Sequence, residues 1–259
     1  MSVTKIVKKY GNSGGIYLPA EWVGGKVKIE LVEQPLNPKK DLLGSLPLEH
    51  VVSLILYGSY VRGEMTEDSD IDVILVTDGE KTEIPQDIRA RYDIQVKGVE
   101  QLKLSVTHDP LFHKILCDEA IALVNGNLLD EIRAIKPETR SINTRIELIE
   151  SSLGIVKEML ELGADGKDVV YPLVLRIKEA LLMECFLENK KYNTKALRKS
   201  VLKNCTPAEF SSLMSIYRNI RDDKKPSNLF ISENTTGKLV TLLEAKIQNV
   251  KQKKLKERH

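Results

Sequence analysis

The stretch LILYGSYVRGEMTEDSDIDVILV, residues 54–76, decides how the rest of the chain is interpreted. It begins and ends as an apolar strand, with a Gly-Ser pair after the first strand and Asp70 and Asp72 at the second. A carboxylate inside an apolar strand is costly unless something compensates its charge. Because residues two apart in a strand point to the same face, Asp70 and Asp72 are predicted to present adjacent carboxylates.

Two adjacent carboxylates repel each other unless a cation lies between them. Magnesium suits this position, because it prefers oxygen ligands and is often held by one or two carboxylates together with substrate phosphates. Upstream, Gly58 and Ser59 stand where a strand is predicted to end and a short helix to begin. Glycine lets the backbone approach a ligand, helix N-termini attract phosphate, and the Ser59 hydroxyl adds a hydrogen bond. The two halves of the stretch are therefore predicted to hold a triphosphate and its metal.

The segment GSYVRGEMTEDSDIDVILV, residues 58–76, resembles the minimal nucleotidyltransferases of the DNA polymerase β superfamily. Their signature is a Gly-Ser turn followed by Asp-x-Asp on a strand, and the resemblance covers about residues 45–135. It implies an enzyme that transfers a nucleoside monophosphate, most simply AMP from ATP, to an acceptor hydroxyl and releases pyrophosphate. It also implies two Mg²⁺ ions that stabilise the entering and leaving oxygens.

The resemblance further implies a third carboxylate from a neighbouring strand, which holds the metal and accepts the proton of the attacking hydroxyl. By position the best match is Asp93 in RYDIQV, while Asp78 and Asp87 compete from polar turn sequence. Arg62 is either a contact of the triphosphate or an exposed helix residue. The remaining acids before the second strand, Glu64, Glu67 and Asp68, are predicted to be solvated.

Three acceptors fit this family: a protein side chain, an RNA end or a small molecule. The sequence does not choose among them. The alternative function is that of a non-catalytic nucleotide- or DNA-binding regulatory protein, and the intact pair of acids argues against it.

The predicted fold class is α+β, in three parts. Residues 1–36 are predicted to be a small β element with strands in KIVKKY, GIYLP and KVKIELVE. Residues 41–135 are predicted to form a nucleotidyltransferase domain with a small mixed sheet, which follows a helix beginning near Pro47. Residues 137–259 are predicted to form a helical bundle, in which apolar residues recur at three- and four-residue steps.

The N-terminal element resembles the AbrB-like swapped-hairpin DNA-binding fold in the order of its glycines, its proline and its alternating strands. That resemblance implies a homodimer and DNA contact through exposed lysines, here Lys5, Lys8, Lys9, Lys26 and Lys28. The helical part resembles the HEPN-like bundles that follow minimal nucleotidyltransferases. Arg218 and Arg221 match part of the HEPN ribonuclease motif, but lysines stand where its histidine belongs, which argues against a nuclease.

Charge is strongly segregated along the chain. The formal charge is +4 over residues 1–40, −10 over residues 41–135 and +8 over residues 136–259, which sums to the net +2. An acidic middle between basic flanks suggests that the middle holds cations and the flanks meet anionic partners. Three scattered cysteines, the lack of a signal-like N-terminus and the lack of a long apolar run predict a cytoplasmic protein without membrane contact.

Overall fold

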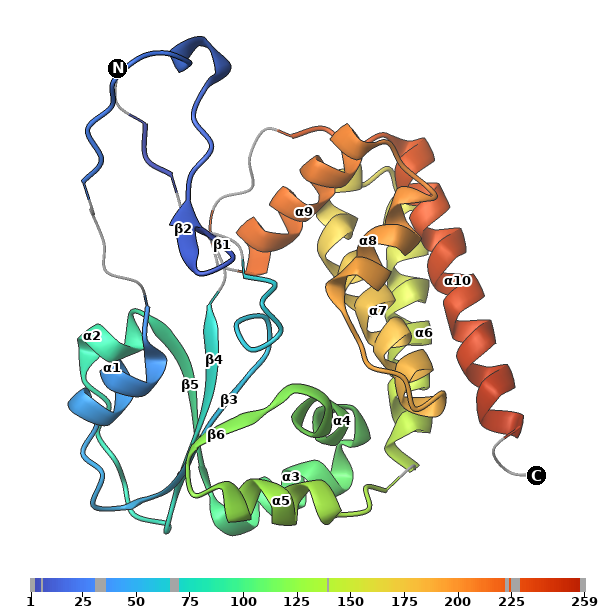
Figure 1. The fold of residues 1–259 in the computed structure, drawn as a ribbon. Helices are drawn as coiled ribbons and strands as arrows, with labels where there is room; N and C mark the ends of the chain where they lie inside the picture. The colour runs from blue at the N-terminus through green and yellow to red at the C-terminus, as the bar shows by residue number, and fades with distance from the viewer. Residues whose placement is uncertain are drawn as a thin grey trace. The chain divides into compact units, whose positions relative to one another are not determined.

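A computed structural model describes residues 3–5, 7–30, 36–65, 70–138, 140–221, 224 and 229–256. They fall into two units, Met1–Asp41 and Leu42–His259. The first unit contains a short β-hairpin, and the second contains a sheet covered by helices together with a group of longer helices (Figure 1). The fold is α+β, which confirms the predicted class.

The first unit is held by a hairpin of strands β1 (Lys8–Tyr10) and β2 (Ser13–Gly15), followed by the 3₁₀ turn η1 (Ala20–Trp22). The strand predicted in GIYLP is wrong, because Gly11 takes a positive φ of 58° and the chain turns there, which pairs Ser13 directly with Tyr10. Residues 26–30 are not a strand either, since alternation alone supplies no pairing partner. Residues 31–33 of that prediction lie outside the described residues.

The second unit begins with a four-stranded sheet in the order β5-β4-β3-β6. Strand β3 pairs antiparallel with β4 and β6, whereas β4 and β5 are parallel, so the sheet is mixed as predicted. The two central strands, β3 and β4, are almost entirely buried, as their apolar runs require. Their bounds are β3 (Val51–Tyr57), β4 (Ile71–Thr77), β5 (Tyr92–Gly98) and β6 (Ile121–Val124).

Helices cover both faces of this sheet (Figure 1). Leu102, Leu116 and Leu129 bring three helices against one face, and Leu42 and Ile88 bring two against the other. The helices on the first face are α3 (Val99–His108), α4 (Pro110–Glu119) and α5 (Gly126–Ala134). Those on the second face are α1 (Pro38–Ser45) and α2 (Gln86–Arg89).

Helix α1 ends where a helix was predicted to start, so the helix expected near Pro47 is wrong. Residues 38–40 instead form the first turn of α1. Proline is tolerated at the first position of a helix, and the Asn37 side chain accepts a hydrogen bond from Lys40 N at 3.1 Å. These two features start the helix before the apolar pair Leu42 and Leu43.

The helical region consists of α6 to α10, and α7 packs against α6, α9 and α10. Its core contains the apolar stripe predicted for α6, with Ile142, Ile146 and Ile149 buried. Helix α7 begins after Asp165, which accepts a hydrogen bond from Lys167 N. The bounds are α6 (Arg140–Glu161), α7 (Gly166–Leu187), α8 (Thr194–Leu202), α9 (Pro207–Arg221) and α10 (Glu233–Lys256). In the described residues, no helix combines the length and the apolar character that crossing a bilayer requires.

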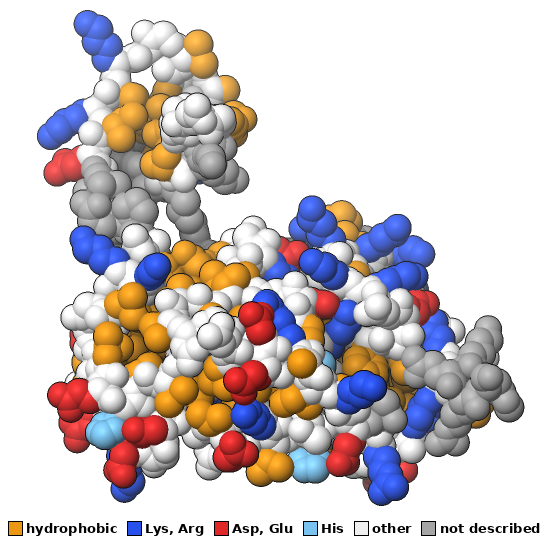
Figure 2. Space-filling view, turned by 60° about the horizontal axis from the view of Figure 1, so that its bottom comes forward, with side chains coloured by type: hydrophobic (Ala, Val, Ile, Leu, Met, Phe, Trp, Pro, Cys, Tyr) orange, Lys and Arg blue, Asp and Glu red, His pale blue; other side chains and the backbone are white. Residues whose placement is uncertain are grey.

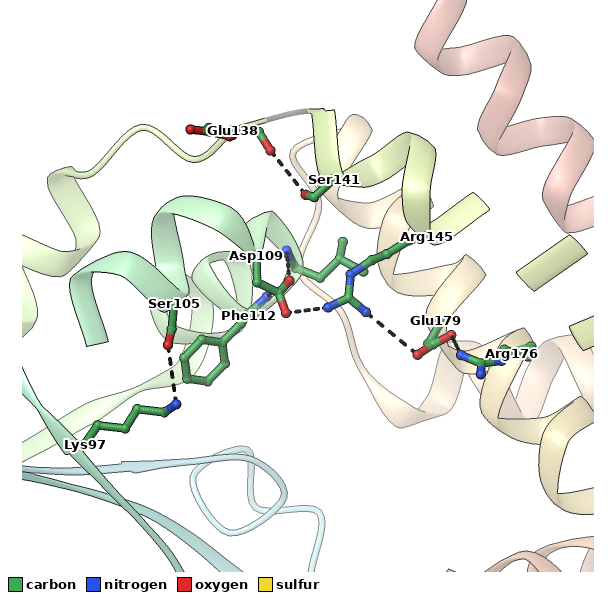
Figure 3. A network of polar contacts seen from close by, with 10 residues as sticks. Lys97, Ser105, Asp109, Phe112, Glu138, Ser141, Arg145, Arg176 and Glu179 are labelled. Atoms are coloured by element: carbon green, nitrogen blue, oxygen red, sulfur yellow. Dashed lines mark hydrogen bonds and ion pairs between the residues drawn. The ribbon is translucent and has the colours of Figure 1, made fainter. Parts of the chain in front are cut away.

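A polar network joins the helices beneath the sheet to the helical region (Figure 3). Asp109 caps α4 by accepting hydrogen bonds from the backbone N–H groups of Leu111 and Phe112, both at 3.1 Å, and also forms a close ion pair with Arg145 of α6. Arg145 lies 3.8 Å from Glu179 of α7, which in turn accepts a hydrogen bond from Arg176 at 2.6 Å. Because these groups are less than one-third exposed, solvent screens them only in part.

We expect Arg145→Met to lower the free energy of unfolding by about 1–2 kcal/mol, because it leaves Asp109 and Glu179 without their shared cation. The matched control is Lys157→Met, which breaks a more exposed pair with Glu244 and is expected to cost less than about 0.5 kcal/mol. Urea denaturation of both variants measures the difference. Equal effects would show that the network does not hold the two regions together.

Candidate active site

Three acids lie together at one end of strands β4 and β5. Asp72 and Asp93 are direct partners in the parallel pairing, so their side chains project from the same face of the sheet. Asp70 precedes β4 by one residue and stands two positions before Asp72. The competing acids are placed elsewhere: Asp78 follows the opposite end of β4 and pairs with His50 at 3.1 Å, and Asp87 belongs to α2.

The surroundings of Asp72 raise its pKa. Its burial, reinforced by the charges of Asp93 and Asp70, raises the pKa of Asp72 to about 6. The cations Lys178 and Arg62 act in the opposite direction. The site therefore holds more negative charge than its own side chains neutralise, as expected of a site that binds a cation.

The absence of a side chain at Gly58 leaves room for the carboxylate of Asp72. The φ of Gly58, 79°, lies in the left-handed region, which favours glycine. A Cβ atom at this position would lie 2.0 Å from Asp72 Oδ2, far inside van der Waals contact. Only glycine therefore allows the carboxylate of Asp72 its position beside the turn.

Glu119, at the end of α4, holds the turn from the opposite side. It accepts hydrogen bonds from Gly58 N at 2.9 Å and from Arg62 Nη1 at 2.5 Å. Arg62 Nε also donates to Glu64 at 2.7 Å, and the guanidinium lies 6.0 Å from the ring of Tyr192. Arg62 is thus a partly buried, doubly paired residue, and Glu64 is not the solvated acid predicted. Glu67 and Asp68 lie outside the described residues.

The chain after Gly58 differs from the predicted short helix. Residues 59–63 form consecutive turns, closed by hydrogen bonds from Arg62 N to Gly58 O and from Glu64 N to Ser59 O. The positive φ of Gly63, 67°, ends the helical course after one turn. A phosphate here would meet the amide groups and the hydroxyl of Ser59, and the Gly58 amide already donates to Glu119.

The helical region supplies cations that were not predicted for the site. Lys178 of α7 is exposed to solvent at its surface. Desolvation by the surrounding protein, followed by the positive charge of Arg62, lowers the pKa of Lys178, whereas the negative charge of Asp72 raises it. Arg221, at the end of α9, donates from Nη2 to Asp70 Oδ2 at 3.5 Å. The sequence signal for Lys178 was the basic charge of the last third of the chain, which does not single it out, whereas Arg221 was noted as part of a HEPN-like motif and not for this site.

The carboxylates of Asp70, Asp72 and Asp93 are ligands that suit a hard divalent cation, although the three side chains do not point at one common position. In the described part of the chain, no three His, Cys, Asp or Glu side chains gather closely enough to hold a metal ion. Asp70 instead contacts Arg221 and is 63 % exposed. Asp72 and Asp93 offer carboxylate oxygens from adjacent strands, which is the chemistry that Mg²⁺ prefers.

A polar pocket of about 330 Å³ opens beside these acids. Its charged lining residues are Asp70, Asp93, Arg89 and Arg91. Its other lining residues are Ala90, Tyr92 and Ile94. The pocket therefore joins the acids to a pair of guanidinium groups.

Comparison with known families agrees with this geometry. Residues 39–135 match the family model of the nucleotidyltransferase domain, which spans the sheet and the helices on both its faces. This part of the chain is a nucleotidyltransferase domain, the domain of a transferase enzyme. A comparison with curated proteins gives no significant match. The match begins at residue 39 and ends at residue 135, so the resemblances of residues 1–36 to an AbrB-like fold and of the helical region to a HEPN-like fold stay predictions.

Proposed function

We propose that this chain is a Mg²⁺-dependent nucleotidyltransferase that moves a nucleoside monophosphate, AMP from ATP, onto an acceptor hydroxyl and releases pyrophosphate. The observation that carries the proposal is the direct pairing of Asp72 with Asp93 across two parallel strands, immediately after Asp70. The turn at Gly58, which has no room for a side chain beside Asp72, supports the same site.

Asp72 and Asp93 would hold the divalent metal, and Asp70 would join them by releasing Arg221. When bound, Mg²⁺ would neutralise the charge that develops on the entering and leaving oxygens. The raised pKa of Asp72 supports this role, since burial and the neighbouring acids make its charge costly until a cation arrives.

Asp93 accepts the proton of the acceptor hydroxyl as the new bond forms between that oxygen and the α-phosphorus. The bond from the α-phosphorus to the bridging oxygen breaks, and pyrophosphate leaves. Asp93 suits this role because, unlike Asp72, it lies on the edge strand of the sheet and is open to solvent. An acceptor can therefore reach it from outside.

The triphosphate is bound by Ser59 and Lys178. In the described residues the Ser59 side chain makes no hydrogen bond, so its hydroxyl is available to a ligand. Lys178 brings a positive charge to the site from the helical region. Arg62 positions the turn through Glu119 and Glu64, and is not needed as a direct phosphate contact.

Lys178→Met is expected to lower kcat/KM for ATP by about 10- to 100-fold, because a charge-assisted contact with the triphosphate is lost. The matched control on the same helix is Lys167→Met, whose ammonium pairs with Asp165 at 3.1 Å and lies at the helix start. Steady-state kinetics with varied ATP measures both variants. An unchanged kcat/KM in Lys178→Met would remove Lys178 from the triphosphate site.

A substitution of Asp93, the third acid of the site, tests the proposal as a whole. Wild-type protein, ATP and Mg²⁺ are incubated with a lysate of the cells that produce the protein, and pyrophosphate release is measured. Asp93→Asn is expected to reduce release by at least about 100-fold, since a proton acceptor is worth that much. Asp78→Asn, at the other end of β4, is expected to remain near wild type. The reverse pattern would refute the assignment of Asp93.

We also propose that the N-terminal unit pairs with a second copy of the chain. Up to residue 30, none of its described side chains is buried, and Tyr17, Val23 and Ile29 are 73, 88 and 67 % exposed. A β element without a core is marginally stable alone, and a second copy would cover these groups. Sedimentation velocity tests this: wild type is expected to be dimeric and a Tyr17→Ser, Val23→Ser, Ile29→Ser variant monomeric. A monomeric wild type would contradict it.

A further inference from the structure

Residues 190–221 form the most basic segment beside the site. They contain eight Lys or Arg residues and a single acid, Glu209. That acid is already committed, because it accepts hydrogen bonds from the backbone and side chain of Thr206, both at 2.8 Å. On the face shown in Figure 2, Lys and Arg side chains gather over the helical region. The eight basic residues of the segment 190–221 are Lys190, Lys191, Lys195, Arg198, Lys199, Lys203, Arg218 and Arg221.

Helix α8 presents three of these basic side chains on one side. Lys195, Arg198 and Lys199 are spaced three and four residues apart and are exposed, while Leu197 and Val201 are buried. In the described chain, Lys195 and Lys199 have no carboxylate partner. Uncompensated cations on one helix face repel one another, and an anionic partner relieves that repulsion.

Both ends of the basic segment reach the catalytic domain next to the site. At its start, Thr194 N donates to Glu64 at 3.4 Å, and the ring of Tyr192 lies beside Arg62. At its end, Arg221 donates to Asp70 at 3.5 Å. Helices α8 and α9 therefore form a basic strip that borders the active site.

The pocket lined by Asp70 and Asp93 brings two further guanidinium groups, Arg89 and Arg91, to the site. Arg89 lines it and makes only a 3.4 Å hydrogen bond to the Ile84 carbonyl, so its charge has no carboxylate partner in the described chain. Guanidinium groups bind phosphate and also stack on nucleobases. At about 330 Å³, the pocket lies at the small end of the range for ligand sites. A pocket of this size suits the terminal nucleotide of a single strand better than a nucleic-acid duplex.

From this arrangement we infer that the acceptor is a single-stranded polynucleotide, which lies along α8 and α9 and places its terminal 3′-hydroxyl at Asp93. The inference rests on the proposed function and names its acceptor class. A polycationic small molecule would be repelled by the strip, and a compact acidic metabolite would not need charges spread over two helices. A strand with one negative charge per nucleotide uses both the strip and the pocket.

Binding is tested with the full-length protein, Ca²⁺ and fluorescein-labelled single-stranded 20-nucleotide RNA and DNA, followed by anisotropy over a salt series. Lys195→Gln with Lys199→Gln is expected to weaken binding about tenfold and to reduce the salt slope by about 1.4, since each lost phosphate contact contributes about 0.7. The matched control, Lys81→Gln with Lys136→Gln, removes two exposed lysines outside the strip and is expected to bind like wild type. Equal loss in both double variants would overturn the strip.

Transfer is tested with ATP labelled at the α-phosphate, a cell lysate as the source of protein and small-molecule acceptors, and the same oligonucleotides, each with a free or a phosphorylated 3′ end. Label is expected only on oligonucleotides with a free 3′-hydroxyl, on RNA, DNA or both, and Arg89→Gln is expected to raise their KM at least fivefold. Label on protein or on a small molecule, with none on oligonucleotides, would overturn this inference and leave the proposed function intact. Absence of both label and pyrophosphate would instead refute the proposed function.

Discussion

Asp72→Asn is expected to abolish nucleotidyl transfer and, at the same time, to stabilise the metal-free protein. Loss of the half-buried carboxylate that we propose holds the metal is expected to reduce transfer by at least about 1,000-fold, which corresponds to about 4 kcal/mol of transition-state stabilisation. The fold itself does not need that charge, because burial and the charge of Asp93 make it costly. An amide keeps the shape of the side chain and removes the repulsion.

The pH dependence follows from the raised pKa of Asp72, which is about 6 in the folded protein against about 3.9 for a free Asp. Between these values the folded state binds more protons than the unfolded state, so stability falls as the pH rises. The advantage of Asp72→Asn therefore develops between about pH 4 and 6 and is complete above that, at about 2–3 kcal/mol. Below about pH 4 the two proteins should be equally stable.

Urea denaturation in EDTA across this pH range measures the effect. The control is Asp130→Asn, an acid on α5 that is 73 % exposed and is expected to change stability by less than about 0.5 kcal/mol. Mg²⁺ should raise the melting temperature of wild type but not that of Asp72→Asn. If Asp72→Asn were less stable than wild type at pH 8 in EDTA, the electrostatic account of this carboxylate would be wrong.

Gly58→Ala is expected to reduce transfer by at least about 100-fold, because an added Cβ displaces the Asp72 carboxylate and small misplacements of reacting groups are this costly. It is also expected to destabilise the protein by about 3 kcal/mol. Of this, about 1–2 kcal/mol comes from the left-handed backbone, and the remainder comes from the contact at 2.0 Å.

Gly63→Ala separates these two causes. Gly63 belongs to the same turn and has a similar φ of 67°, but a Cβ there would meet no atom within 4 Å. We expect it to cost only the backbone component, about 1 kcal/mol, and to leave transfer within about threefold of wild type. If both alanine variants lost activity equally, the shape of the turn, and not the space beside Asp72, would limit catalysis.

The strands that carry the three acids could be predicted because their signals are local. Asp70 and Asp72 interrupt an apolar run at a two-residue spacing, and this alone places them on one face. The resemblance to the polymerase β superfamily implies a third carboxylate, and Asp93 is the best match because it heads the next apolar strand; the parallel register of β4 and β5 places it beside Asp72. The buried stripe of α6 followed from its helical period in the same way.

Contacts between distant segments could not be predicted. Glu119 holds Gly58 and Arg62 across about 60 residues of sequence, and nothing near Glu119 distinguishes it from an ordinary exposed acid. Lys178 is one lysine among many in a basic region, and only the packing of α7 brings it to Asp72. Such contacts depend on tertiary structure, which a local pattern does not encode.

The central claim is that the chain transfers the α-phosphate of a nucleoside triphosphate. The direct test incubates wild-type protein, Mg²⁺ and cell lysate with ATP labelled at either the α- or the γ-phosphate, with Asp72→Asn in parallel. We expect an acceptor labelled only from the α-position, with equimolar pyrophosphate and no labelling by Asp72→Asn. Labelling from the γ-position, or labelling that persists in Asp72→Asn, would contradict it.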